Sequence, residues 1–179
     1  DKIRNALEFA ASYSWDSQAG NFRVREEVPV YRFHLLRPQQ SILVGGIRVT
    51  AVLGNHQIDK ERLILEEQVL NYVCQWHGKT FFYGLDSSYT LPLTLEFLRR
   101  FRFDAAVLDA TFGYLDIDPF GSGHQNFSMV ERTVEEFRTA GIIDARTRIV
   151  LSHISLRQVP PHDEIAADLQ ARGFTLAHD

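Results

Sequence analysis

The sequence predicts an α/β fold, and three observations lead to that prediction. Apolar segments of strand length, separated by glycine-containing turns, fill the first half of the chain and predict successive antiparallel strands. After Asp86, short apolar strands alternate with amphipathic helices, an order typical of helices layered on a sheet. Lone histidine and aspartate residues directly follow several strands, which predicts a polar site at one edge of that sheet.

The first half is expected to contain one short helix, one loop and a series of strands. Apolar residues recur at helical spacing over Asp1–Ala11, whereas the polar stretch Tyr13–Glu27 is expected to be a loop. Gly45–Gly46 and His77–Lys79 separate apolar runs and predict two hairpin turns. The expected strands are Val28–Leu36, Ser41–Val44, Ile47–Leu53, Leu63–Trp76 and Thr80–Leu85.

The second half is expected to alternate helices with buried strands. Pro92 lies in the first turn of a helix that runs to about Arg102. Ser128, with Glu131 three residues later, forms a capping-box pattern and begins a helix that ends near Gly141. The remaining expected elements are the strands Ala105–Leu108, Arg148–Ser152 and Thr175–His178, the loop Gly113–Gly123 and the helix Pro161–Arg172.

Composition limits the classes of protein to which the chain can belong. The formal net charge of −4 argues against a dedicated nucleic-acid-binding protein, which would be basic. Cys74 is the single cysteine, so no intrachain disulfide can form, which fits a reducing compartment. The sequence has no apolar run of membrane-spanning length, and we expect a cytoplasmic protein with no membrane partner. We treat residues 1–179 as a single partial domain, because the chain begins in an apparent mid-helix and stops in a strand.

Four polar residues carry the candidate chemistry. His56, Asp86 and His153 each follow a predicted buried strand, and His124 lies in a glycine-rich loop. Two histidines and a carboxylate directed into one cleft, with a further histidine beside them, are typical of a divalent-metal hydrolase. Each residue also has a plainer interpretation. Asp86 can cap a turn, and histidines at strand ends or in loops can simply bond to backbone or solvent.

Five segments together carry a family resemblance. They are Val49–His56, Phe82–Ser87, Ala105–Thr111, Gly123–Gln125 and Ile149–Ser155. In this order they resemble the metallo-β-lactamase superfamily, and within it the phosphodiesterase branch. That branch includes the cyclic phosphodiesterase of phosphonate breakdown and the tRNA 3′-processing endonucleases. The resemblance runs from about Val28 to Asp179.

The resemblance implies a four-layer αβ/βα fold of mixed sheets flanked by helices, of which this chain would be the C-terminal portion. It also implies two divalent metal ions, with zinc or manganese expected. His56 matches a ligand of the first metal, Asp86 the carboxylate that bridges both metals, and His153 a ligand of the second. His124 resembles the histidine that contacts the scissile phosphate and helps to protonate the leaving group.

The chain departs from the family pattern in one respect. Family members carry a His-x-His-x-Asp-His motif upstream of these segments, and this sequence has none; its one earlier histidine is His34. A catalytic zinc normally needs about three protein ligands. The site in these 179 residues is therefore expected to be incomplete, and the chain alone to be inactive.

The resemblance implies a metal-dependent phosphodiesterase that acts on a small or cyclic phosphodiester, with nucleic acid as the less favoured substrate. Two alternatives stay open. One is a non-catalytic remnant that no longer binds metal, and the other is a thioester or lactone hydrolase of the same fold. We also expect that the chain can form a homodimer to cover its exposed core.

Overall fold

The computed structural model describes residues 9, 11–25, 34–56, 69–119 and 122–178. Its contacts divide the chain into two compact units, Asp1–Leu35 and Leu36–Asp179. None of the helices in the described ranges is long and apolar enough to cross a membrane. The expected helix Asp1–Ala11 and strand Val28–Leu36 fall mostly outside the described residues.

The first unit contains a hairpin of β1 (Tyr13–Asp16) and β2 (Asn21–Val24). The expectation of a loop over Tyr13–Glu27 is therefore wrong. Trp15 lies directly opposite Phe22, with ring centroids 5.1 Å apart in an edge-to-face arrangement. A cross-strand aromatic pair of this kind stabilises a hairpin even where the flanking residues are polar.

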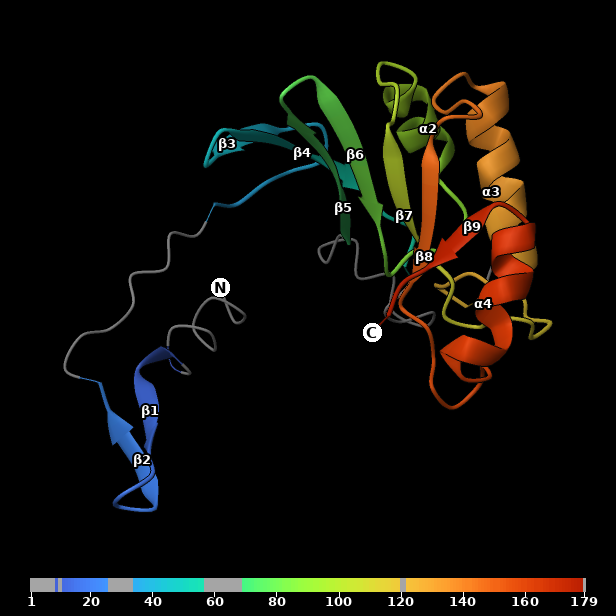
Figure 1. The fold of residues 1–179 in the computed structure, drawn as a ribbon. Coiled ribbons are helices and arrows are strands. Elements are labelled where there is room, and N and C mark those ends of the chain that lie inside the picture. The colour runs from blue at the N-terminus through green and yellow to red at the C-terminus, as the bar shows by residue number, and fades with distance from the viewer. Residues whose placement is uncertain (1–8, 10, 26–33, 57–68, 120–121, 179) are drawn as a thin grey trace. The chain divides into compact units, whose positions relative to one another are not determined.

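The second unit contains a seven-stranded mixed sheet in the order β3-β4-β5-β6-β7-β8-β9 (Figure 1). The strands from β3 to β6 pair antiparallel, and those from β6 to β9 pair parallel. Their bounds are β3 Ser41–Val44, β4 Ile47–Leu53, β5 Leu70–Trp76, β6 Lys79–Gly84, β7 Ala105–Asp109, β8 Arg148–Ser152 and β9 Phe174–Leu176.

Both hairpin turns expected in this unit are confirmed. Gly45 and Gly46 have φ values of 53° and 85°, and His77 and Gly78 have φ values of 45° and 74°. Two consecutive positive φ angles belong to the tight turn that matches the twist of paired strands. The β3–β4 and β5–β6 hairpins follow directly from these two dipeptides.

Three helices are present in the described part of this unit: α2 (Pro92–Leu98), α3 (Phe127–Thr139) and α4 (His162–Ala171). The prediction that a capping box at Ser128 begins α3 is wrong. The cap of α3 is Asn126, whose side-chain oxygen accepts a hydrogen bond from the Met129 amide at 2.8 Å. Helix α2 ends at Leu98, four residues before the expected end.

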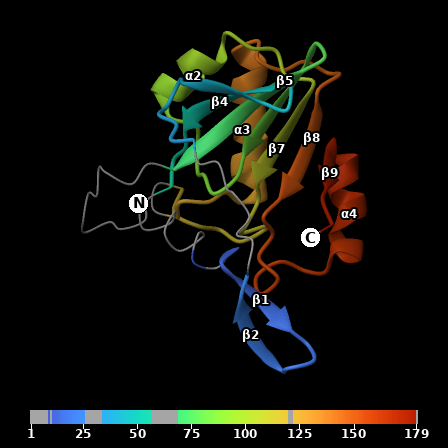
Figure 2. The same ribbon diagram turned by 90° about the vertical axis from the view of Figure 1, so that its left-hand side faces the viewer.

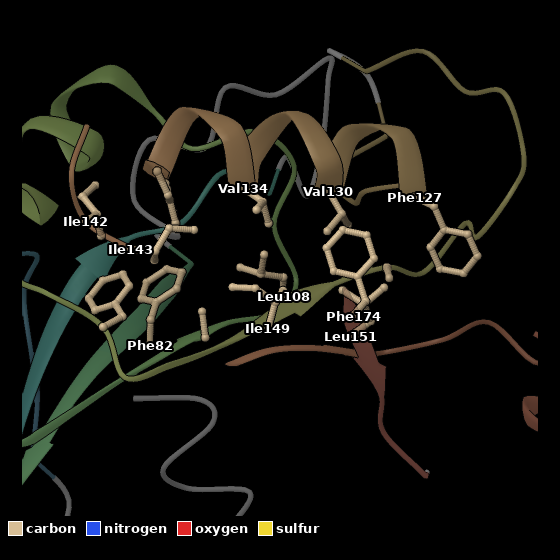
Figure 3. Close-up of a cluster of buried hydrophobic side chains, with 14 of the residues drawn as sticks. Phe82, Leu108, Phe127, Val130, Val134, Ile142, Ile143, Ile149, Leu151 and Phe174 are labelled. Atoms are coloured by element: carbon tan, nitrogen blue, oxygen red, sulfur yellow. The ribbon is translucent and has the colours of Figure 1, made fainter. Parts of the chain in front are cut away.

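The helices cover one face of the sheet, as two orientations show (Figure 1 and Figure 2). In Figure 3, Phe127, Val130 and Val134 of α3 face Leu108 and its neighbours on the strands. Leu108 is 1% exposed, so its side chain contributes about 1.5–3 kcal/mol through burial. This core fixes the strands, and through them the residues at the strand ends.

Four strands end at the same edge of the sheet. Strands β4 and β6 are each antiparallel to β5, and β7 and β8 continue parallel to β6, so all four run in one direction. His56 follows β4, Asp86 follows β6, and His153 follows β8, while Asp109 is the last residue of β7. The carboxyl edge of a parallel sheet is where ligands bind in α/β proteins.

Candidate metal centre

The backbone at Asp86 and at His153 adopts a left-handed conformation. Their φ angles are 47° and 63°, respectively. This conformation costs a residue with a β-carbon about 1–2 kcal/mol, so a residue keeps it only where surrounding contacts hold it. Both residues lie immediately beyond parallel strands, and the strained turn directs each side chain back toward the sheet edge. His153 Nε2 lies 3.2 Å from Asp86 Oδ1.

A buried polar network holds the loop that carries Asp86. Gln125 is 2% exposed, and its amide nitrogen donates to the carbonyls of Ser87 and Ser88 at 3.3 and 3.4 Å. The hydroxyl of Thr133, on α3, donates to the Gln125 side-chain oxygen at 2.9 Å. Asn71, on β5, donates to the Leu85 carbonyl and accepts from the Ser87 hydroxyl. The loop is therefore tied to both α3 and the sheet.

Asp109 is fully buried and lies at the centre of the site. Its Oδ1 accepts hydrogen bonds from the backbone N–H and the hydroxyl of Thr111 and from the backbone N–H of Gln125, at 3.0–3.1 Å. Its Oδ2 lies 2.9 Å from His124 Nδ1 and 3.5 Å from His153 Nδ1. Because both oxygens already have partners, this carboxylate orients the histidines and is not itself placed as a metal ligand.

Thr111 fixes the tautomer of His153. The Thr111 hydroxyl donates to Asp109, so it accepts at 2.7 Å from His153 Nδ1. His153 Nε2 faces the Asp86 carboxylate, and in the neutral imidazole this nitrogen carries the lone pair that a metal ion would bind. A histidine that donates through one nitrogen to a polar anchor and presents the other is the usual arrangement of a metal-binding imidazole.

His124 forms an ion pair with Asp109. Its Nδ1 lies 2.9 Å from Asp109 Oδ2, and its ring stacks on that of His153 at a centroid distance of 5.2 Å. The hydrogen bond to Asp109 is the largest cause that raises the pKa of His124 above 6.5; burial lowers it, and the charges of Asp109 and Asp86 raise it further. With Nδ1 engaged, Nε2 is the nitrogen available to a substrate.

His56 lies beside this cluster. Its Nδ1 donates to the Gly123 carbonyl at 3.0 Å, and its ring centroid lies 4.7 Å from that of His124. A β-carbon on Gly123 would come within 2.5 Å of His56 Nδ1, so only glycine permits this approach. The contact anchors the ring through Nδ1 and leaves Nε2 for another ligand.

The donor set suits a divalent metal ion. One donor atom each from Asp86, Asp109, His124 and His153 lies within 4.8 Å of the others. Imidazole and carboxylate donors suit zinc or manganese. The Asp86 and His153 side chains are 52% and 38% exposed, so both remain accessible to an ion. Because the buried Asp109 is already bonded to Thr111, Gln125 and His124, the accessible donors among the described residues are Asp86 and His153, which fit part of a metal site.

The structure brings together three of the four predicted site residues, Asp86, His124 and His153, and places His56 next to them. Their roles as ligands and catalyst remain predictions. Sequence reasoning gave no role to Asp109, Thr111 or Gln125, although all three lie in the segments that carry the family resemblance. The signal that could have identified Asp109 is a carboxylate closing a fully apolar strand, where packing offers no reason for a charge.

The fold resembles that of several solved proteins. The metallo-β-lactamase fold protein YhfI from Bacillus subtilis is 20% identical, with 79% of this chain and 51% of that chain covered and a TM-score of 0.56. A diphosphatase from the PhnP family is 20% identical, with coverages of 83% and 46% and a TM-score of 0.51. Zn²⁺-bound PqqB from Methylobacterium extorquens is 17% identical, with coverages of 80% and 52% and a TM-score of 0.53.

No family model and no curated protein matches the sequence. The chain spans about half the length of the solved structures that it resembles. The seven-stranded mixed sheet with helices on one face agrees with these structures over about four fifths of the chain. The α/β prediction is therefore confirmed, and the chain has the metallo-β-lactamase fold.

Proposed function

We propose that this chain forms part of a metal-dependent hydrolase that cleaves phosphodiesters. The observation that carries the proposal is that a candidate metal-donor pair and an oriented histidine lie side by side at one sheet edge. Asp86 and His153 form an accessible donor pair, and the buried Asp109 orients His124 beside it. A donor pair suited to a metal ion, next to an oriented histidine whose pKa is raised, suits the hydrolysis of a phosphoester.

Asp86, His153 and His56 are the residues that would hold divalent ions, with zinc or manganese favoured by their donors. When bound, such ions activate water and neutralise charge on a phosphoryl group. The protein contributes the positions: Thr111 and Asp109 fix the His153 ring, and Gly123 fixes the His56 ring. Both rings are anchored through Nδ1, which leaves Nε2 as the nitrogen available to a metal ion.

His124 would supply the proton for the leaving group. Its raised pKa keeps a larger fraction of the imidazole protonated near neutral pH than an unperturbed histidine would have. Asp109 stabilises that protonated form through Nδ1, so Nε2–H is the group that donates to a departing alkoxide oxygen. The remaining ligands are proposed to come from a segment outside these 179 residues, in line with the half-length match.

For this protein we propose a small or cyclic phosphodiester as substrate and the cytoplasm as its compartment. The net charge of −4 supports a small substrate over nucleic acid, and the lone cysteine supports a reducing compartment. One of the solved structures that the chain resembles is a diphosphatase from the PhnP family, which supports a phosphorylated substrate.

The test is metal binding and hydrolysis by a protein that contains this chain and the segment preceding it. Metal content is measured after dialysis against Zn²⁺ or Mn²⁺, and hydrolysis with bis(4-nitrophenyl) phosphate. We expect bound metal and turnover in the wild type, and loss of both in Asp86→Ala and His153→Ala. A protein of that length without metal would contradict the proposal and favour the non-catalytic alternative. If the protein binds metal but hydrolyses only a thioester or a lactone, the proposed metal site stands and the proposed substrate class is overturned.

A further inference from the structure

A cavity separate from the donor cluster lies between the loop after β8 and the start of α4. Its volume is about 250 Å³. Leu156 belongs to its wall and is 90% exposed, so a large apolar side chain stands in the opening without protein packing over it. The lining residues are Ile154, Leu156, Val159, Pro160, Pro161, His162, Ile165, Leu176, Ala177 and His178.

This cavity adjoins the candidate metal centre. Ile154 lines it and also lines the neighbouring hollow of about 320 Å³, which contains His153 and Thr111. The two hollows therefore share Ile154 as a wall residue, and Ile154 directly follows His153 in the chain. Neighbouring hollows with a common wall residue suit a substrate whose reacting centre lies at His153 and whose substituent occupies the cavity.

Two stacked imidazoles form the polar part of the wall. The rings of His162, at the start of α4, and His178, just after β9, have centroids 3.6 Å apart and planes inclined by 25°. His162 Nδ1 lies 3.1 Å from the Asp163 carboxylate, which leaves Nε2 for another partner. The cavity thus combines aliphatic and proline surfaces with flat rings whose edges carry nitrogen donors or acceptors.

The charge of the wall argues against an anionic occupant. Among the described residues that line the cavity, none is a lysine or an arginine. A phosphate group placed there would lose water without gaining a fixed cation, which is unfavourable. A neutral planar ring instead covers apolar surface with its faces and meets the imidazole nitrogens with its edge.

We propose that this cavity binds the planar aromatic ring of the substrate's ester group, while the phosphodiester lies at the metal centre. The proposal deepens the proposed function and rests on it for the identity of the substrate. The ring is either a nucleobase or a simple aryl group, since both present an apolar face and a flat edge. Leu156 and His178 are the specificity-determining residues, because they contribute the apolar and the polar side of the cavity.

The test is direct binding to the metal-free chain, so that it does not depend on hydrolysis. Adenosine and 4-nitrophenol serve as nucleobase and aryl probes, and cyclohexanol as an aliphatic probe of similar ring size. Histidine ring and leucine methyl resonances are followed by heteronuclear NMR. We expect saturable shifts of the His162, His178 and Leu156 signals with an aromatic probe and much weaker ones with cyclohexanol. The tighter of the two aromatic probes identifies the kind of ring.

Two variants locate the binding. Leu156→Ala should weaken aromatic binding about tenfold through lost apolar contact, whereas Leu93→Ala on α2, 81% exposed, should leave it unchanged. His178→Ala should remove the preference for aromatic over aliphatic rings. Equal binding of cyclohexanol to the wild type, or unchanged affinity in Leu156→Ala, would overturn the proposal.

The metal-free measurement separates this inference from the proposed function. Ring binding without turnover by the longer protein would count against phosphodiester hydrolysis and leave the cavity assignment in place. Turnover without ring binding would support phosphodiester hydrolysis and overturn the cavity assignment. In an active protein, Leu156→Ala should raise KM for an aryl phosphodiester and leave kcat, and KM for a dimethyl phosphodiester, nearly unchanged. A fall in kcat for both substrates would contradict a role in ring binding.

Discussion

At the residue scale, Asp109 is the buried group to which the histidines of the candidate site are anchored. Its carboxylate accepts from Thr111 and Gln125 on one oxygen and contacts both His124 and His153 on the other. A fully buried charge is tolerated only when paired in this way. Of the two histidines that contact Asp109, His153 is the one whose Nε2 lies 3.2 Å from Asp86 Oδ1.

His124 should be needed for turnover and not for metal binding. In the metal-bound longer protein, we expect His124→Ala to lower kcat about 10²–10⁴-fold, the range for a general acid, because no other described side chain is oriented by Asp109 toward a substrate. Metal content measured by elemental analysis should match that of the wild type. Loss of metal in His124→Ala would show that His124 is a ligand, whereas Asp86→Ala serves as the control that does lose metal.

Asp109→Asn should lower the pKa of His124, because the hydrogen bond to Asp109 is the largest cause of its elevation. A raised folded-state pKa gives stability that is fully present below the unfolded value of about 6.5 and is lost as the pH rises through the folded value. The wild-type chain should therefore lose this part of its free energy of unfolding as the pH rises from about 6.5 through the raised pKa of His124. NMR titration of the His124 ring in the metal-free chain measures the pKa directly, and urea unfolding measures the stability.

The matched control is Asp116→Asn, an exposed aspartate in the same long loop as His124. It should leave the His124 titration unchanged. If Asp109→Asn also leaves it unchanged while circular dichroism shows a folded protein, then the ion pair does not determine the protonation of His124.

At the element scale, the loop after β6 depends on side chains from other elements. Gln125 comes directly before the α3 cap, and Asn71 comes from β5, yet both bond to the residues that flank Asp86. The left-handed backbone of Asp86 needs such support, because the loop has no regular structure of its own. The position of Asp86, the carboxylate proposed to bind metal, is thus held by buried amides far away in the sequence.

Gln125→Leu should weaken both the fold and metal binding. The substitution leaves the Ser87 and Ser88 carbonyls and the Thr133 hydroxyl without their partner in a buried site. We expect a loss of about 3 kcal/mol in the free energy of unfolding, measured by urea denaturation, together with weaker zinc binding. Gln75→Leu, on β5, is the control and should change stability by less than about 0.5 kcal/mol. Equal effects of the two substitutions would contradict the role of the network.

The elements differ in how far the sequence could predict them. The strands of the second unit were predictable, because apolar runs and paired turn residues such as Gly45–Gly46 are local signals. The β1–β2 hairpin was not, because Trp15 and Phe22 stabilise it across strands while the surrounding residues are polar. The α3 cap was misplaced by two residues, because Asn126 and Ser128 have equally suitable side chains and only the backbone decides between them.

At the scale of the whole molecule, strand direction explains why the candidate site was only partly predictable. His56, Asp86 and His153 were identified as strand-end residues, and the common direction of β4, β6 and β8 brings them to one edge. The role of Asp109 depends on β7 lying between β6 and β8, and strand order is not written in any local pattern.

The sheet face opposite the helices is the basis for the expected self-association. Side chains on β5, β6, β7 and β8 that point away from the helical layer are apolar and only half-buried, among them Tyr72, Phe81, Tyr83, Val107 and Val150. Tyr83 is 43% exposed. An apolar face of this kind marks an interaction surface or an aggregation hazard. In the 179-residue chain a second copy can supply the missing cover.

We expect the chain to form a homodimer and Tyr83→Lys to shift it toward monomer, because a charge at the centre of the face must be desolvated on pairing. Size-exclusion chromatography with light scattering, run over a range of protein concentrations, measures the mass directly. Leu93→Lys, which places the same charge at an exposed position on α2, should leave the dimer intact. A wild-type chain that elutes as a monomer at every concentration would contradict the expectation. A dimer unaffected by Tyr83→Lys would move the interface to another surface, with the exposed Leu43 and Val44 at the β3–β4 turn as the next residues to substitute.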